Sequence, residues 1–130
     1  GQREMKVLIV DDCRTTRKLL SFYIKAKGFD VATAENGLDA MSKVAQGDIN
    51  MIITDLNMPF MDGIELIKTL KADPSRAHIP VLMVTTEKDA EEKKRAYDAG
   101  VNGFMMKPVS SDDVVKNVKN IMKNIFGEEA

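Results

Sequence analysis

The stretch MIITDLNMPFMDG, residues 51–63, carries the clearest structural signal in the chain. Its first four residues are apolar or β-branched, which favours a strand buried on both faces. Asp55 follows directly, and a loop containing Pro59 then runs to Gly63, where a helical pattern begins. The stretch therefore predicts a buried strand that delivers a carboxylate to its C-terminal end.

Short apolar runs alternate with longer helical patterns along the whole chain, so the arrangement of a strand followed by a helix is expected to recur. Strands are expected at about 5–10, 30–34, 51–54, 79–84 and 103–106. Helices are expected at about 14–27, 37–46, 63–72, 89–99 and 111–126, with left-handed caps at Gly28, Gly47 and Gly100. Strand–helix alternation with right-handed crossovers predicts an α/β fold, a three-layer sandwich in one domain of residues 1–130.

Composition narrows the functional class. The chain has 130 residues, of which 44% are hydrophobic and 30% charged, and its net charge of -1 gives no polybasic surface for nucleic acid or membrane. Cys13 is the only cysteine, which excludes an internal disulfide and a cysteine zinc cluster. No apolar run approaches the roughly 20 residues of a membrane span, and the charged start is not a signal peptide. We therefore expect a cytoplasmic protein. Residues 1–4 are either a processing scar or a natural tail.

Polar side chains end most of the expected strands. These residues are, in chain order, Asp11, Asp12, Asp55, Thr85, Thr86 and Lys107. In an open parallel sheet the strand C-termini share one edge, and ligands bind there. Three acids, a hydroxyl and a lysine are therefore expected to converge.

Such a cluster suits metal-assisted phosphoryl acceptance. Carboxylates that remain ionised together call for a cation, and oxygen ligands beside a phosphoryl group favour Mg²⁺. Asp55 could attack phosphorus to form an aspartyl phosphate, while Lys107 and Thr85 share the charge on its oxygens. The alternative is a group of capping residues at loop starts, which would require five independent placements to coincide.

Four motifs resemble the receiver domain of two-component response regulators, most closely its chemotaxis members. They are Val10-Asp11-Asp12, DLNMPFMDG at 55–63, Val84-Thr85-Thr86 and FMMKP at 104–108. The match extends from about residue 5 to 126, and the order and spacing of the motifs agree. The resemblance implies a five-stranded parallel sheet in the order 2-1-3-4-5 with five helices.

The resemblance also implies the metal site. A histidine kinase would phosphorylate Asp55, with Mg²⁺ held by Asp12, Asp55 and the backbone carbonyl of Asn57. Asp11 would act mainly through a coordinated water. Asn57 and Glu87 would flank the path of the hydrolytic water and modulate hydrolysis.

Further implied roles concern the switch. Thr85, with Thr86 beside it, would be the switch hydroxyl, Lys107 would bind the phosphate, and Phe104 would be the switch aromatic. The Lys107–Pro108 bond is expected to be cis, a form that is costly except before proline. Two residues depart from the family pattern, since Phe104 lacks the hydroxyl of the usual tyrosine and Val109 stands where phenylalanine is common.

Other site classes fit less well. Asp55 and Asn57 match the first two ligand positions of a calcium loop, but Pro59, Phe60 and Leu66 exclude one. A flavodoxin would have to bind a flavin phosphate in its first loop, where Asp11-Asp12 would repel it. A P-loop protein is excluded because no Gly-x4-Gly-Lys-Ser/Thr sequence is present. A phosphatase of the haloacid dehalogenase type would need an acid at position 57 and a cap domain.

One expected helix has two interpretations. The expected helix at 89–99 has only Ala90, Ala96 and Tyr97 as apolar anchors; it is either a solvated helix with charge pairs such as Glu91 with Arg95, or an element that shifts easily. Cys13 is expected to be buried. Met51, Met83 and Met122 are expected in the core.

The phosphoryl group must come from outside, because His78 is the only histidine and is expected in a surface loop. We expect a stand-alone monomer, not an enzyme beyond self-catalysed phosphoryl acceptance and autodephosphorylation. Its partners would be a histidine kinase and a phosphorylation-dependent target, with the flagellar motor switch as the leading candidate and a phosphatase as an additional partner. The alternatives are a phosphorelay intermediate and a receiver cut from a larger regulator.

Overall fold

A computed structural model describes residues 5–127, so the origin of residues 1–4 lies outside the described residues. The strands are β1 (Lys6–Val10), β2 (Asp30–Ala34), β3 (Met51–Thr54), β4 (Val81–Thr85) and β5 (Gly103–Met106). The helices are α1 (Arg14–Lys25), α2 (Gly37–Ala45), α3 (Gly63–Lys71), α4 (Ala90–Ala99) and α5 (Ser111–Phe126). Every predicted element is confirmed, with small shifts at the ends.

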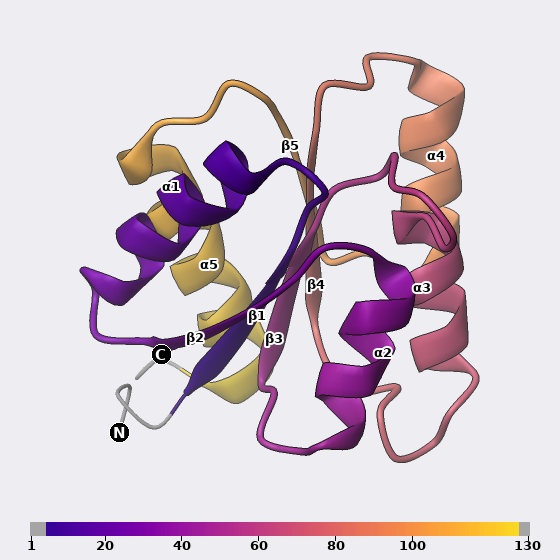
Figure 1. Cartoon of the computed structure of the whole chain (residues 1–130), viewed down its shortest axis with the longest axis horizontal. Helices are drawn as coiled ribbons and strands as arrows, with labels where there is room; N and C mark the ends of the chain where they lie inside the picture. The colour runs from indigo at the N-terminus through magenta and orange to yellow at the C-terminus, as the bar shows by residue number, and fades with distance from the viewer. Residues whose placement is uncertain (1–4, 128–130) are drawn as a thin grey trace.

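The five strands pair in parallel in the order β2-β1-β3-β4-β5. Helices α1 and α5 cover one face of the sheet, and α2, α3 and α4 cover the other (Figure 1). The fold is therefore the three-layer α/β sandwich with the predicted strand order. Within the described residues, no helix has the length and apolar character needed to cross a membrane.

The core has two halves, one on each face of the sheet. Val7 and Ile9 of β1 belong to the half beneath α1 and α5, whereas Leu8 and Val10 belong to the other half. Burying such a side chain contributes about 1.5–3 kcal/mol. The buried central strands therefore fix the positions of the loops at their C-terminal ends. The predicted core methionines, Met51, Met83 and Met122, are fully buried.

β4 begins later than predicted. Pro80 has no N–H to donate, and its carbonyl instead accepts from the backbone N–H of Ile52 at 3.0 Å. Val81 is the first paired residue, and its N–H donates to the Asn102 side chain at 2.8 Å. At its other end β4 includes Thr85, which pairs with Met106 of β5.

Helix α4 is weakly anchored. Ala96 is its only buried residue, while Ala90 and Tyr97 are exposed, so two of the three predicted anchors are wrong. The predicted pairing of Arg95 with Glu91 is also wrong, because Arg95 pairs with Glu92. Positions three and four residues back on a helix are both within reach, and the chosen rotamer decides between them.

Two isolated residues have different outcomes. His78 is exposed, as predicted. Cys13 is exposed rather than buried, because it is the N-cap of α1 and its neighbours Asp12 and Arg14 are exposed too.

Gly28, Gly47 and Gly100 adopt the predicted left-handed conformation, with φ of 94°, 90° and 114°.

Candidate phosphoacceptor site

The site residues emerge where four parallel strands end. The sheet register pairs Val10 of β1 with Thr54 of β3, and Thr85 of β4 with Met106 of β5. The residues that follow these ends therefore leave the same edge of the sheet. This places Asp11, Asp55 and Lys107 together although they are far apart in the sequence.

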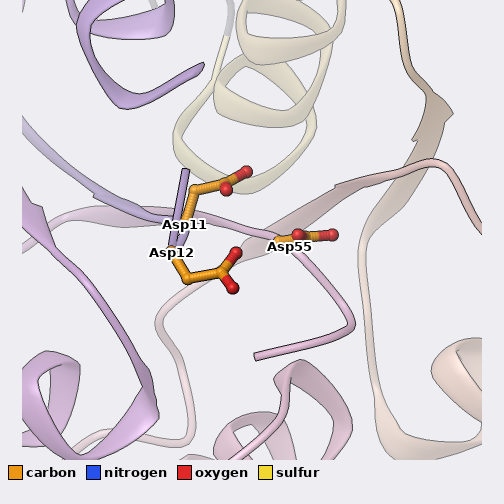
Figure 2. Close-up of side chains that lie close together, drawn as sticks. All are labelled: Asp11, Asp12 and Asp55. Carbon is orange, nitrogen blue, oxygen red and sulfur yellow. The ribbon is translucent and has the colours of Figure 1, made fainter. Parts of the chain in front are cut away.

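Three carboxylates gather at this edge. Figure 2 shows Asp11 and Asp12 beyond β1 and Asp55 beyond β3. One ligand oxygen from each lies within 4.8 Å of the others. Asp11 and Asp55 are buried, at 1% and 8% exposure, whereas Asp12 is exposed. The cluster therefore has two buried acids on one side and one acid open to solvent.

Lys107 bridges the two buried acids. Its Nζ donates to Asp11 Oδ2 at 2.7 Å and to Asp55 Oδ2 at 3.3 Å. Its backbone N–H donates to the Thr85 carbonyl at 2.8 Å, and its bond to Pro108 is cis, as expected. Burial lowers the pKa of Lys107, but the bond to Asp11 and the charges of Asp55 and Asp11 outweigh it and leave that pKa raised. Lys107 is thus a fully charged ammonium at neutral pH.

Asp55 lies in an environment that does not fully compensate its charge. Burial raises its pKa above the ordinary value, and the opposing effect of Lys107 does not cancel this rise. Its Oδ1 accepts from the N–H of Leu56 at 2.8 Å, while its Oδ2 has the longer contact with Lys107. By contrast, Asp11 has both oxygens in short contacts, because its Oδ1 also accepts from the N–H of Cys13 at 2.9 Å.

The loop after β3 is built around Gly63. A Cβ at Gly63 would lie 2.3 Å from the Asp55 carbonyl oxygen, so only glycine lets α3 start this close to the site. Asp62 caps the helix and forms a capping box with Glu65. Phe60 is 81% exposed with φ of 71°, a conformation that is rare for a bulky side chain. Asn57 lies exposed in the same loop.

Of the predicted switch residues, Thr85 ends β4, Thr86 directly follows it and Phe104 lies on β5. Thr85 is fully buried, and its Oγ1 accepts from the backbone N–H of Glu87 at 3.1 Å, whereas Thr86 is exposed. Phe104 is half-buried beside α4. Its ring centroid lies 6.4 Å from that of Tyr97 and 5.7 Å from Lys93 Nζ.

The donor set fits a hard divalent cation. Every predicted ligand atom is oxygen, and three carboxylates face one lysine, which leaves an excess of negative charge. Within residues 5–127, the Asp12 carboxylate makes no hydrogen bond to another residue. Asp12 is therefore the acid whose oxygens are most available to a metal such as Mg²⁺.

One contact at the site has no signal in the motifs. The guanidinium of Arg17 donates to the backbone carbonyl of Asp11 at 2.7 Å. An arginine one turn into the helix that follows an acid pair could have suggested it, because such a side chain can reach back over the helix start.

Comparison with known proteins places the chain among regulators. The model of the response regulator receiver domain matches residues 7–119. Chemotaxis protein CheY-3 of Vibrio cholerae is 37% identical over 124 residues, which cover 95% of each chain. Chemotaxis protein CheY of Pseudomonas aeruginosa is 36% identical, covering 95% of this chain and 100% of that protein.

Solved structures agree with this placement. Chemotaxis protein CheY4 of Vibrio cholerae superposes with a TM-score of 0.85 at 32% identity, covering 90% of this chain and 98% of that one. A putative response regulator from Chloroflexus aurantiacus gives 0.86 at 30% identity, covering 91% and 97%. With its strand order, its acid cluster and these relatives, the chain belongs to the response regulator receiver domain family and is similar to its CheY-type chemotaxis members.

Proposed function

We propose that this receiver accepts a phosphoryl group on Asp55 from a phosphohistidine of a histidine kinase. The observation that carries the proposal is the convergence of three carboxylates within 4.8 Å, two of them bonded to Lys107. Asp55 is the favoured nucleophile, because its Oδ2 lies 3.3 Å from Lys107 Nζ, farther than the 2.7 Å between that nitrogen and Asp11 Oδ2. Asp11 has both oxygens engaged and is favoured as a supporting acid.

The transfer forms one bond and breaks another. An Asp55 oxygen bonds to phosphorus while the P–N bond to the donor imidazole breaks, and the imidazole nitrogen takes a proton from solvent. Lys107 keeps its charge beside the phosphoryl oxygens. When bound by Asp12, Asp55, the Asn57 carbonyl and, through water, Asp11, Mg²⁺ supplies charge neutralisation on those oxygens. The cycle ends when water hydrolyses the aspartyl phosphate, and we propose that Asn57 and Glu87 modulate the rate of this hydrolysis.

The same site can drive a switch through Thr85. Its oxygen accepts from the Glu87 N–H at 3.1 Å, and its own hydroxyl proton is available to a phosphoryl oxygen. A hydrogen bond to a charged group is worth about 1.5–3 kcal/mol, which shifts a two-state population roughly tenfold to a hundredfold. Movement of Thr85 would carry Glu87 with it and open space for Phe104 to turn inward. Helix α4, with Ala96 as its one buried residue, would follow.

The output is proposed to be phosphorylation-dependent protein binding. Relatives at 36–37% identity are named chemotaxis proteins, so we propose a role in chemotaxis with the flagellar motor switch as target. The binding face would comprise α4, β5 and α5. We further propose that the protein works as a cytoplasmic monomer, with a phosphatase as an additional partner and without nucleic acid or membrane. Transfer of phosphate from Asp55 to a second histidine protein would instead favour the phosphorelay role.

Acetyl phosphate tests the chemistry, because it needs no protein donor. With Mg²⁺, the parent protein should be labelled on Asp55, and Asp55→Asn or a chelator should abolish the labelling. Asp48→Asn is the matched control, since Asp48 is exposed and its φ of 75° suits asparagine. Equal labelling of Asp55→Asn and the parent would place the nucleophile elsewhere.

Thr85→Ala tests the switch. The variant should still be labelled on Asp55, but the structural change should not spread from Asp55 to α4 and Phe104. In NMR spectra, adding beryllofluoride as a phosphoryl mimic should shift residues 86–98 and Phe104 in the parent only. Full propagation in Thr85→Ala would exclude the proposed coupling.

A further inference from the structure

The start of α1 is built differently from the other helix starts in residues 5–127. Helices α2 to α5 each have a side-chain cap and at least one acid in the first turn. Helix α1 has Cys13 as its N-cap, without a side-chain hydrogen bond, and no acid in its first turn. It begins with Arg14, and Arg17 follows, although positive charge is unfavourable at a helix N-terminus. Two contacts replace the usual cap at this junction: the Asp11 carboxylate accepts from the Cys13 N–H at 2.9 Å, and the Arg17 guanidinium contacts the loop.

Arg17 makes the contact that reaches the loop backbone. Its Nη1 donates to the backbone carbonyl of Asp11 at 2.7 Å, while its own N–H donates to the Cys13 carbonyl at 3.0 Å. The second of these is the ordinary first bond of the helix, so of the two bonds the guanidinium contact alone ties the loop to α1. A guanidinium is a charged donor, and charge-assisted hydrogen bonds are roughly twice as strong as neutral ones.

The tether acts on Asp12 through covalent geometry. The Asp11 carbonyl and the Asp12 N–H belong to one planar peptide unit, so fixing the carbonyl oxygen fixes the plane from which Asp12 leaves. Asp11 has three further ties, namely its N–H to Ala34 at 3.1 Å and its carboxylate to Cys13 and Lys107. The Asp12 side chain, in contrast, forms no hydrogen bond to another described residue and is exposed.

We propose that Arg17 is a positioning residue that sets the Mg²⁺ affinity of the site by orienting Asp12. The inference rests on the proposed function, because it assigns Asp12 to the metal. The effect of Arg17 on the phosphoryl chemistry is expected to be smaller, since Arg17 contacts neither Asp55 nor Lys107 and meets the Lys107 contact only through Asp11, at 2.7 Å.

Calorimetric titration of the unphosphorylated protein with MgCl2 is the direct test. Loss of a residue that orients a metal ligand typically weakens metal binding about tenfold to a hundredfold, and we expect this range for Arg17→Ala. Arg17→Lys keeps the charge and one donor, so it should recover part of the affinity. Arg14→Ala is the matched control, because it removes an equal charge one turn earlier without a contact to the Asp11 carbonyl. The maximal rate of Asp55 labelling at saturating Mg²⁺ should change far less than the Kd.

A second measurement separates orientation from folding. In metal-free NMR spectra, Arg17→Ala should move the ¹³C resonance of the Asp11 carbonyl and the amide of Asp12, while the amides of Leu56 and Lys107 stay in place. Equal Mg²⁺ affinity in Arg17→Ala and Arg14→Ala, or unchanged Asp11 and Asp12 resonances, would overturn the inference alone. A parent protein that binds no Mg²⁺ would overturn the metal assignment of the proposed function as well.

Discussion

Lys107→Met is the most informative single change at this site. Methionine keeps the length and apolar stem of the side chain but removes the ammonium. That ammonium lies 2.7 Å from Asp11 Oδ2 and 3.3 Å from Asp55 Oδ2, and its side chain is only 16% exposed. The variant therefore leaves two buried carboxylates without their shared cation.

The structure sets the size of the effect. Removing one partner of a buried ion pair costs about 3–5 kcal/mol. The open side of the cluster at Asp12 admits solvent, so we expect about 2–4 kcal/mol of destabilisation without metal. Metal binding should strengthen in parallel. Unit charges 4 Å apart interact by about 1 kcal/mol even in water, so a divalent ion freed from the ammonium should gain about 2 kcal/mol, or roughly thirtyfold in Kd.

Urea unfolding at neutral pH provides the assay. The free energy of unfolding is measured in EDTA and then with increasing MgCl2 at constant ionic strength. Lys107→Met should be less stable than the parent in EDTA and should gain more from Mg²⁺. Lys88→Met, an exposed lysine in the loop after β4, should change stability by less than about 0.5 kcal/mol and leave the Mg²⁺ response unaltered. A Lys107→Met protein as stable as its parent in EDTA, or with no larger Mg²⁺ gain, would refute the bridging role.

Three further predictions concern stability. Gly63→Ala should lower the free energy of unfolding by more than about 3 kcal/mol, because its Cβ would lie 2.3 Å from a backbone oxygen. Gly28→Ala should lower it by only about 1–2 kcal/mol, because Gly28 has a φ of 94° but open space around it. Equal losses would contradict the steric argument. Phe60→Asn should raise the melting temperature by relieving about 0.5–1 kcal/mol of left-handed strain, since the phenyl ring is exposed; a lower melting temperature would show that the ring contributes contacts. Burial raises the pKa of Asp55, so the folded state holds that proton more tightly than the unfolded state and this group stabilises the fold less as pH rises above the ordinary aspartate pKa of about 3.9. The stability of Asp55→Asn relative to the parent, measured without metal, should therefore increase from mildly acidic to neutral pH, and a constant difference would contradict the raised pKa.

Most of the fold could be predicted because its elements have distinct patterns. The buried strands β1, β3 and β4 are nearly all aliphatic, and helices α1, α2 and α4 end near glycines with positive φ. The start of β4 could not be placed from hydrophobicity alone, since Ile79 is as apolar as the strand itself. Pairing begins only after Pro80, which has no N–H to donate.

The convergence of the site residues could also be predicted, because parallel strands deliver their C-terminal residues to one edge. What escaped prediction depends on side-chain rotamers. Arg95 pairs with Glu92 rather than Glu91, and Arg17 reaches back to a backbone carbonyl. An exposed helix pair of the Arg95 kind is worth only about 0.2–0.5 kcal/mol, less than sequence patterns can resolve. The exposure of Cys13 likewise depends on which side of the α1 start faces solvent.

The division of contacts within the acid cluster implies that metal affinity and phosphoryl acceptance can be adjusted separately. Asp55 and Lys107 contact each other and are held from β3, β4 and β5, so a change at either one alters both the proposed nucleophile and the local charge. Asp12 is oriented from the other side, through the peptide that Arg17 holds. A substitution at Arg17 can then change how much Mg²⁺ is needed without changing the attacking oxygen. Receivers that share Asp55 and Lys107 but differ at the position of Arg17 should accordingly differ in Mg²⁺ dependence more than in their maximal rate of phosphorylation.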